Sequence, residues 1–222
     1  MATMANRASG SRSATAAALA TTLLFSVPVL YAVKPDTWRF LFPWHPTLAV
    51  LAYGLITQPA VLLVRLGRTR LHWALQAAST ACALLGCWAA FVHKAALGKP
   101  HFSTWHSWTG LAALLLTLLE AAVGVGAMTL RTSTVGKRYP WLKYAALRRV
   151  HRALGLSAHG FATVAMVVGL RSHYGRETLA KALPLGDAGA VQLAVQALAA
   201  APFTAIVHQL WRRYYGADRF RK

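Results

Sequence analysis

The chain alternates between long apolar runs and shorter segments that are polar and basic. We expect six membrane helices, at about residues 14–33, 45–64, 72–92, 106–129, 151–170 and 189–210. A helix of about twenty residues, rising about 1.5 Å per residue, is long enough to cross the hydrocarbon core of a bilayer. Because the connections are short and leave no room for a soluble domain, the pattern predicts one compact six-helix bundle.

The bundle domain is expected over residues 14–210, between two short tails. Residues 1–13 are small, polar and basic, which predicts a disordered cytoplasmic tail, and 211–222 form a basic cytoplasmic tail. A signal peptide is the alternative for the first apolar run, because Arg7 and Arg12 precede it. The run is long and no small-residue cleavage site follows it, so a membrane helix is the preferred interpretation.

Composition supports a membrane protein over a soluble nucleic-acid-binding one. Hydrophobic residues make up 56% of the chain and charged residues only 13%, whereas soluble domains carry about 25% charged residues. The net charge of +19 comes from basic residues in short loops, which form no face of a soluble domain, so no nucleic-acid partner is expected. Cys82 and Cys87 lie within one apolar run and indicate packing residues.

The distribution of basic residues predicts the orientation of the bundle. Loops that flank cytoplasmic helix ends carry an excess of Lys and Arg. In this chain seventeen of the 24 Lys and Arg residues fall on the side of the two termini and seven on the other side. Both termini are therefore expected to be cytoplasmic.

Four histidines form two layers when the helices are placed in this orientation. His45 and His106 open two apolar runs on the non-cytoplasmic side, and His72 and His151 open two others on the cytoplasmic side. Ionisable residues inside a membrane bundle are functional by default. Imidazole is a common metal ligand, and cofactor sites in bundles are built from side chains on facing helices. Each layer is therefore a candidate metal or cofactor site.

The metal in such a layer could be bare or held within haem. Zinc and copper sites usually add carboxylates, thiols or a third histidine, and neither layer obviously supplies them. Two imidazoles suit a haem, whose porphyrin provides the other four ligands. Nearby aromatic and small residues are candidate walls for a flat macrocycle, although they are also typical of interface belts and helix contacts: Trp44, Trp73, Trp105, Trp108, Gly110 and Gly155. A histidine-lined metal or proton transporter without haem is the alternative, with Glu120 as its one acidic residue in an apolar run.

Four short motifs occur in the order of one known family. They are WHP at 44–46, HWALQ at 72–76, WHSWTG at 105–110 and HRALG at 151–155. With them, about residues 14–210 resemble the cytochrome b561 family of transmembrane ascorbate-dependent reductases. HKAALGKPH at 93–101 is similar to the short vertebrate-type branch of that family.

The resemblance implies an all-α integral membrane protein with two non-covalent, bis-histidine b haems in the core of helices two to five. It assigns His45 and His106 to the non-cytoplasmic haem iron, and His72 and His151 to the cytoplasmic one. Cytoplasmic ascorbate would donate electrons, and a ferric chelate or monodehydroascorbate across the membrane would accept them. The implied location is the endoplasmic reticulum or endomembrane vesicles, and a homodimer is left open.

Substrate contacts are expected at both ends of the bundle. Arg70 and Arg149, within an arginine-rich group, are candidates to attract ascorbate, which is a monoanion. The loop residues His93, Lys94, Lys99 and His101 are candidates to meet the acceptor. Topology signals and a solvated loop, respectively, are the simpler alternatives.

Two further residues lie within apolar runs without an assigned role. Glu120 follows His106 by fourteen residues, or about 21 Å of helix, which brings it near the level of the cytoplasmic haem. The family resemblance implies a neutral polar residue there, and we expect Glu120 to accept a hydrogen bond from a ligand imidazole. His159 lies about 80° around its helix from His151 and is expected to be packed or near a haem edge.

Overall fold

The computed structural model describes residues 2–35, 40–132, 144–183 and 188–215, and all regular structure within them is helical. The helices are α1 (Ala2–Val33), α2 (Trp44–Ala49), η1 (Val50–Ile56), α3 (Thr57–Arg65), α4 (Thr69–Ala96), α5 (Trp105–Thr132), α7 (Tyr144–Leu170), α8 (His173–Ala182) and α9 (Ala188–Tyr215). The expected all-α class is therefore confirmed.

Five helical stretches are long and apolar enough to cross a bilayer. They are Ala16–Val33, Trp44–Val64, Thr69–Ala96, Trp105–Leu130 and Tyr144–Leu170. The sixth helix that we expected is present as α9, whose apolar stretch among the described residues is the shorter Gly189–Ala201.

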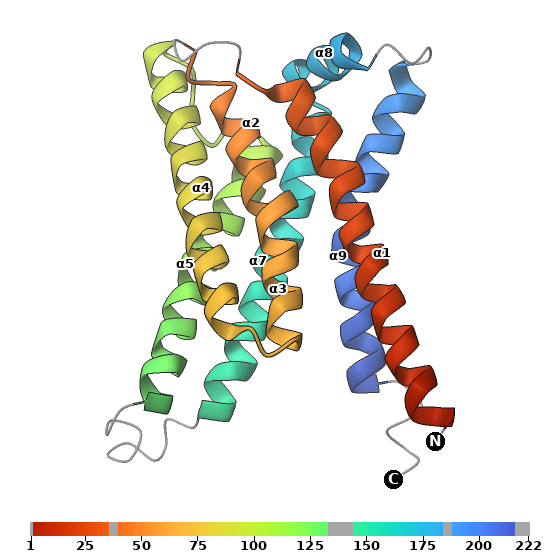
Figure 1. The fold of residues 1–222 in the computed structure, drawn as a ribbon. Coiled ribbons are helices and arrows are strands. Elements are labelled where there is room, and N and C mark those ends of the chain that lie inside the picture. The colour runs from red at the N-terminus through yellow and green to blue at the C-terminus, as the bar shows by residue number, and fades with distance from the viewer. Residues whose placement is uncertain (1, 36–39, 133–143, 184–187, 216–222) are drawn as a thin grey trace.

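The helices are arranged as one bundle with a pair of helices beside it (Figure 1). The α2–η1–α3 span packs on α4, and α5 packs along α7. Helices α1 and α9 pack together and against this group, with an apolar core that includes Phe25, Val29, Val50, Val195 and Ala199. The start of α1 and the end of α9 lie at one end of the molecule, and α8 lies at the other.

The second span, formed by α2, η1 and α3, changes from an α-helix to a π-helix and back. Its segment η1 is a π-helix, which has one residue more than an α-helix in the same turn and is often found at functional sites. The turn is held by hydroxyl groups, since Thr57 Oγ1 and Ser79 Oγ lie 2.9 and 3.0 Å from the carbonyl oxygen of Ala52. The span is anchored at its start as well, where Thr47 Oγ1 donates to the carbonyl of Val33 at the end of α1.

Several boundaries differ from the sequence-based expectations. Helix α1 begins at Ala2, within the segment expected to be a disordered tail, and α9 continues past 210 to Tyr215. Helix α7 begins at Tyr144, so Arg148 and Arg149 lie on a helix. The extensions at 2–13 and 144–150 contain several Ala and Arg residues, which have high helix propensity. The unexpected helix α8 starts at an N-cap, where the Ser172 side chain accepts from the backbone of Gly175.

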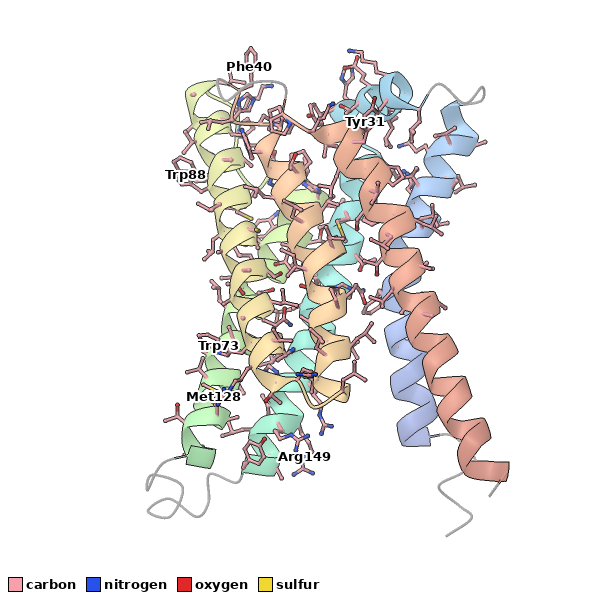
Figure 2. All side chains as sticks on the ribbon, in the orientation of Figure 1. Tyr31, Phe40, Trp73, Trp88, Met128 and Arg149 are labelled. Carbon is pink, nitrogen blue, oxygen red and sulfur yellow. The ribbon has the colours of Figure 1, made fainter. Side chains whose placement is uncertain are left out.

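The tryptophans expected as haem walls mostly face outwards. Trp73 and Trp88 point away from the neighbouring helices (Figure 2) and are 53% and 56% exposed. Trp105 and Trp108 are 81% and 55% exposed. This exposure favours the aromatic belt of a membrane protein over a haem wall for Trp73, Trp105 and Trp108.

Candidate functional site

The first histidine layer lies at the α8 end of the bundle. His45 of α2 and His106 of α5 face each other with their Nε2 atoms 3.5 Å apart and their ring planes at 81°. Each Nδ1 lies near a backbone carbonyl oxygen, at 3.0 Å from Gly86 for His45 and at 2.9 Å from Ala165 for His106. The structure thus brings together the two residues that were predicted to form this layer.

The second layer lies at the opposite, arginine-rich end, which we define by Arg68, Arg70, Arg148 and Arg149. His72 of α4 and His151 of α7 have ring centroids 6.2 Å apart and planes at 89°. His72 Nδ1 is 2.9 Å from the carbonyl of Ala60, and His151 Nδ1 is 3.1 Å from the backbone carbonyl of Glu120. This predicted pair also comes together.

The backbone contacts fix the proton of each imidazole. A carbonyl oxygen can only accept, so Nδ1 must carry the hydrogen in all four rings, and Nε2 presents a lone pair. Two Nε2 lone pairs at 3.5 Å repel each other unless a cation lies between them. Metal-ligating histidines commonly donate their second N–H to a backbone carbonyl in this way. The layers therefore have the donor pattern of metal ligands.

Glycines make room for one imidazole in each layer. A Cβ atom at Gly169 of α7 would lie 2.9 Å from Cε1 of His106, and one at Gly124 of α5 would lie 3.1 Å from Cε1 of His151. In both helices the histidine and the glycine are eighteen residues apart, from His106 to Gly124 and from His151 to Gly169. Five α-helical turns have about eighteen residues, so each helix places both on the same face.

Helices α5 and α7 therefore pair antiparallel in a fixed register. The residue numbers of the facing pairs His106 and Gly169, and Gly124 and His151, add to 275. Glu120 and Gly155 obey the same rule, since a Cβ atom at Gly155 would lie 3.0 Å from Oε1 of Glu120. The two ends of this helix pair are thus built as near repeats of each other.

Glu120 lies beside the second layer, as its position along the helix predicted. Its Oε1 is 3.6 Å from Nδ1 of His151, and its side chain is 13% exposed. This distance is longer than a hydrogen bond, so the backbone carbonyl of Glu120, and not its carboxylate, accepts the hydrogen bond from His151 Nδ1. The carboxylate lies close to the same N–H group but does not form a hydrogen bond with it.

The two histidines that are candidates to meet the electron acceptor, His93 and His101, contact different aromatic rings. His93 lies against Phe42, with ring centroids 5.1 Å apart, and Phe42 also contacts His45 and Tyr174 at 6.2 and 4.9 Å. His101 instead stacks on Phe91 at 4.2 Å. Both contacts lie in the region where α4 and α5 are connected.

The two lysines of this loop differ in their surroundings. Lys94 Nζ donates to the carbonyl of Pro100 at 3.2 Å, whereas the Lys99 side chain is exposed. At the arginine-rich end Arg70 and Arg149 are both exposed, and Arg149 projects from the end of α7 (Figure 2). Neighbouring Arg148 lies over the ring of Tyr144 at 5.4 Å.

His159 is packed, in agreement with one of its two expected roles. Its Nε2 is 2.7 Å from Nε2 of the fully buried Gln58, and its ring lies 5.8 Å from that of Phe203. The pair lies between the two histidine layers, because His159 is eight residues along α7 from His151 and six from Ala165. It connects α3 to α7 through a buried polar contact.

Sequence reasoning missed the glycines and the carbonyl acceptors of the two layers. The carbonyls have no signal in the sequence, because any residue offers one. Gly124 and Gly169 do have a signal, which is the spacing of eighteen residues from a histidine in two antiparallel helices. That spacing becomes informative only when α5 and α7 are known to be neighbours.

Comparison with known proteins identifies the class of this bundle. The family model described as eukaryotic cytochrome b561 matches residues 44–175. The chain belongs to the eukaryotic cytochrome b561 family.

Several characterised relatives are similar over much of the chain. Transmembrane reductase CYB561D2 of Bos taurus is 34% identical over 168 residues, which are 71% of this chain and 72% of the relative. The Homo sapiens protein of that name is 33% identical over the same shares. The plasma membrane ascorbate-dependent reductase CYBRD1 of Mus musculus is 33% identical over 92 residues, which are 37% of this chain and 32% of the relative.

The family implies haem b, and the residues present fit that group. Each layer offers two Nε2 lone pairs, and a porphyrin supplies the remaining ligands of its iron. Within the part of the chain that the structure describes, no group of three or more His, Cys, Asp or Glu side chains could hold a bare metal ion. His45 and His106, with their Nε2 atoms 3.5 Å apart, would hold one haem iron, and His72 and His151 would hold the other.

Proposed function

We propose that this chain is a transmembrane oxidoreductase that passes electrons from ascorbate on the cytoplasmic side to a ferric chelate or monodehydroascorbate on the other. The proposal rests above all on one observation. At each end of one membrane bundle, two imidazoles from different helices face each other, and all four donate Nδ1–H to a backbone carbonyl. The names of the relatives, transmembrane reductase and ascorbate-dependent reductase, support the same activity.

In this proposal His45 and His106 hold one haem b, and His72 and His151 hold a second. A bound haem supplies a reversible one-electron carrier at each level. The protein keeps each imidazole neutral and oriented through its carbonyl partner. The glycines at 124 and 169 keep space free for the rings, and the surrounding helices exclude water.

The two ends of the bundle have complementary roles. Arg70 and Arg149, at the arginine-rich end, attract the ascorbate anion. At the α8 end the loop with His93, Lys94, Lys99 and His101 receives the acceptor. The six helices over 14–210 all span the membrane, the flanking tails 1–13 and 211–222 are cytoplasmic, and the location is the endoplasmic reticulum or endomembrane vesicles.

The decisive experiment uses the full chain, purified in detergent and then placed in vesicles. We expect about two haems per chain, a reduced-minus-oxidised visible spectrum typical of a low-spin b haem, and reduction by ascorbate. In vesicles loaded with ascorbate, an external ferric chelate should be reduced only when the protein is present. A purified, folded chain without haem would overturn the proposal and favour a transporter.

A further inference from the structure

The two ends of the α5 and α7 pair are near repeats, but one pair of equivalent residues, Ala165 and Glu120, differs in chemistry. Ala165 and Glu120 occupy equivalent positions, each fourteen residues past the histidine of its own helix. The backbone carbonyl of Ala165 accepts from His106, and that of Glu120 accepts from His151. The side chains differ completely, because one is a methyl group and the other a carboxylate.

The opposite helix provides space for the Glu120 carboxylate. Gly155 faces it, and a Cβ atom there would lie only 3.0 Å from Oε1 and 3.3 Å from Cδ. The equivalent glycine at the other end, Gly110, faces Ala165 with 4.0 Å to its Cβ. Gly155 and Glu120 therefore fit each other, and the carboxylate is held between α5 and α7 instead of pointing to lipid.

The carboxyl group of Glu120 faces the second histidine layer. Its Oε1 atom lies 3.6 Å from Nδ1 of His151. Among the residues that the structure describes, no Lys or Arg forms an ion pair with this carboxylate. An N–H that faces both a carbonyl and a carboxylate makes its imidazole a stronger electron donor to a bound metal.

We propose that Glu120 is a positioning residue that lowers the reduction potential of the haem held by His72 and His151. This inference rests on the proposed function and extends it. Negative charge next to a ligand imidazole stabilises the ferric state relative to the ferrous state, and hydrogen bonding and local charge are the means by which proteins adjust haem potentials. Because Ala165 has no charge, the His45 and His106 site lacks this effect. By itself, this effect lowers the potential at the arginine-rich end relative to the α8 end, which favours electron flow in the proposed direction.

The test is a redox titration of the purified holoprotein with Glu120→Gln. Glutamine keeps the size and a hydrogen-bond acceptor but removes the charge. We expect the ratio of oxidised to reduced haem at a fixed solution potential to fall about tenfold for one component, which is an upward shift of about 59 mV in its midpoint for a one-electron couple. The other component should not move. The low-spin ferric EPR signal of the shifted component should change as well, because the donor strength of its imidazole changes.

Two further variants separate this role from a purely structural one. Gly155→Ala retains the carboxylate but crowds it away from His151, so the same component should shift upwards by a smaller amount. Glu177→Gln removes an equally close carboxylate, 3.4 Å from Nδ1 of His173, on the exposed helix α8. It should move neither midpoint, which controls for loss of one negative charge.

The outcomes distinguish the two proposals. A parent protein without two redox-active haem components would overturn the proposed function. A parent with two components whose midpoints are the same in Glu120→Gln would overturn the inference alone. If Glu120→Gln loses haem, the shift in Gly155→Ala decides, and an unshifted midpoint there would overturn the inference.

Discussion

The two histidine layers have the same architecture but different surroundings. In both, two imidazoles stand almost perpendicular, each Nδ1 meets a backbone carbonyl, and one ring rests on a glycine. The layer at the α8 end lies beneath the aromatic group of Phe42, His93 and Tyr174. The layer at the arginine-rich end has Glu120 beside it. Ligand geometry is thus duplicated, while charge and access differ.

This comparison separates the residues that form both candidate haem sites from the residues that make the two ends different. A duplicated set of ligands would conduct electrons equally well both ways. A difference in potential or in substrate access between the ends requires residues that occur at one end only, such as Glu120, Arg70 or the loop from 93 to 101. Variants of the shared parts should therefore abolish a site, whereas variants of the unshared parts should only change rates or potentials.

The largest effect is expected from removing one ligand of each layer. His106→Ala should lose the haem of the α8 end and His72→Ala the other, so each variant should retain about one haem per chain. Quantifying haem and comparing difference spectra would check this. If both substitutions removed the same spectral component, the pairing of the histidines would be wrong.

A smaller but still site-specific loss is expected from the glycines. In Gly169→Ala the new Cβ would lie 2.9 Å from His106 Cε1, so that ring must move and haem binding at its layer should weaken severalfold or more. Gly124→Ala should affect the His151 layer less, since its closest approach is 3.1 Å.

The matched control for these variants is Gly126→Ala, on the same helix as Gly124. A Cβ atom at Gly126 has no neighbour within 4 Å, so both haems should remain, and helix propensity should improve by up to about 1 kcal/mol. Equal haem loss in the variants at 124, 126 and 169 would indicate a general effect on the helices instead of a local clash.

At the arginine-rich end, a change in rate is expected without a change in haem content. Arg70→Ala should slow reduction by ascorbate about threefold at low salt, because it removes electrostatic attraction of an anion. The difference should shrink in about 0.5 M salt, where charges are screened within a few ångströms. Stopped-flow spectra measure this rate. Arg176→Ala, at the other end of the bundle, should leave it unchanged, and equal slowing would mean that only net charge matters.

The smallest effect is expected at the α8 end. Replacing Lys99 and His101 together by Ala should leave ascorbate reduction intact and slow only reoxidation by a ferric chelate, by about twofold to threefold. The control is the double substitution of Lys181 and His173, which removes the same residue types from the exposed helix α8. Equal reoxidation rates in the two double variants would mean that the loop is a solvated surface and does not bind the electron acceptor.

The sequence predicted most of the spans and the pairing of the four histidines. Both depend on length and depth along a helix, which apolar runs define directly. It also placed Glu120 near the level of the correct layer, because helical rise is constant. The same arithmetic placed the start of the first helix near residue 14, whereas α1 begins at Ala2, because helix ends in water depend on weak propensities.

Features that depend on contacts between helices could not be predicted. The approach of Gly169 to His106 and the burial of Gln58 against His159 require knowledge of which faces meet. Trp105 is next to a candidate ligand in sequence, yet its side chain is 81% exposed. Neighbours in sequence on a helix are about 100° apart, so they seldom share a site.

The π-helical segment η1 has a consequence for how the two layers stay aligned. In α4, α5 and α7 the carbonyl that holds a partner histidine lies fourteen residues past the helix's own histidine, as from His72 to Gly86. In the second span the interval is fifteen, from His45 to Ala60. The extra residue is absorbed by the wide turn at Val50–Ile56. If all fifteen residues were wound as an ordinary α-helix, one end of the span would be turned by about 100° against the other, whereas deleting one residue in the wide turn should give an α-helix with the interval of fourteen and keep the two ends in phase. The wide turn therefore keeps both ends of the span facing their histidine layers, although the interval between them has one extra residue.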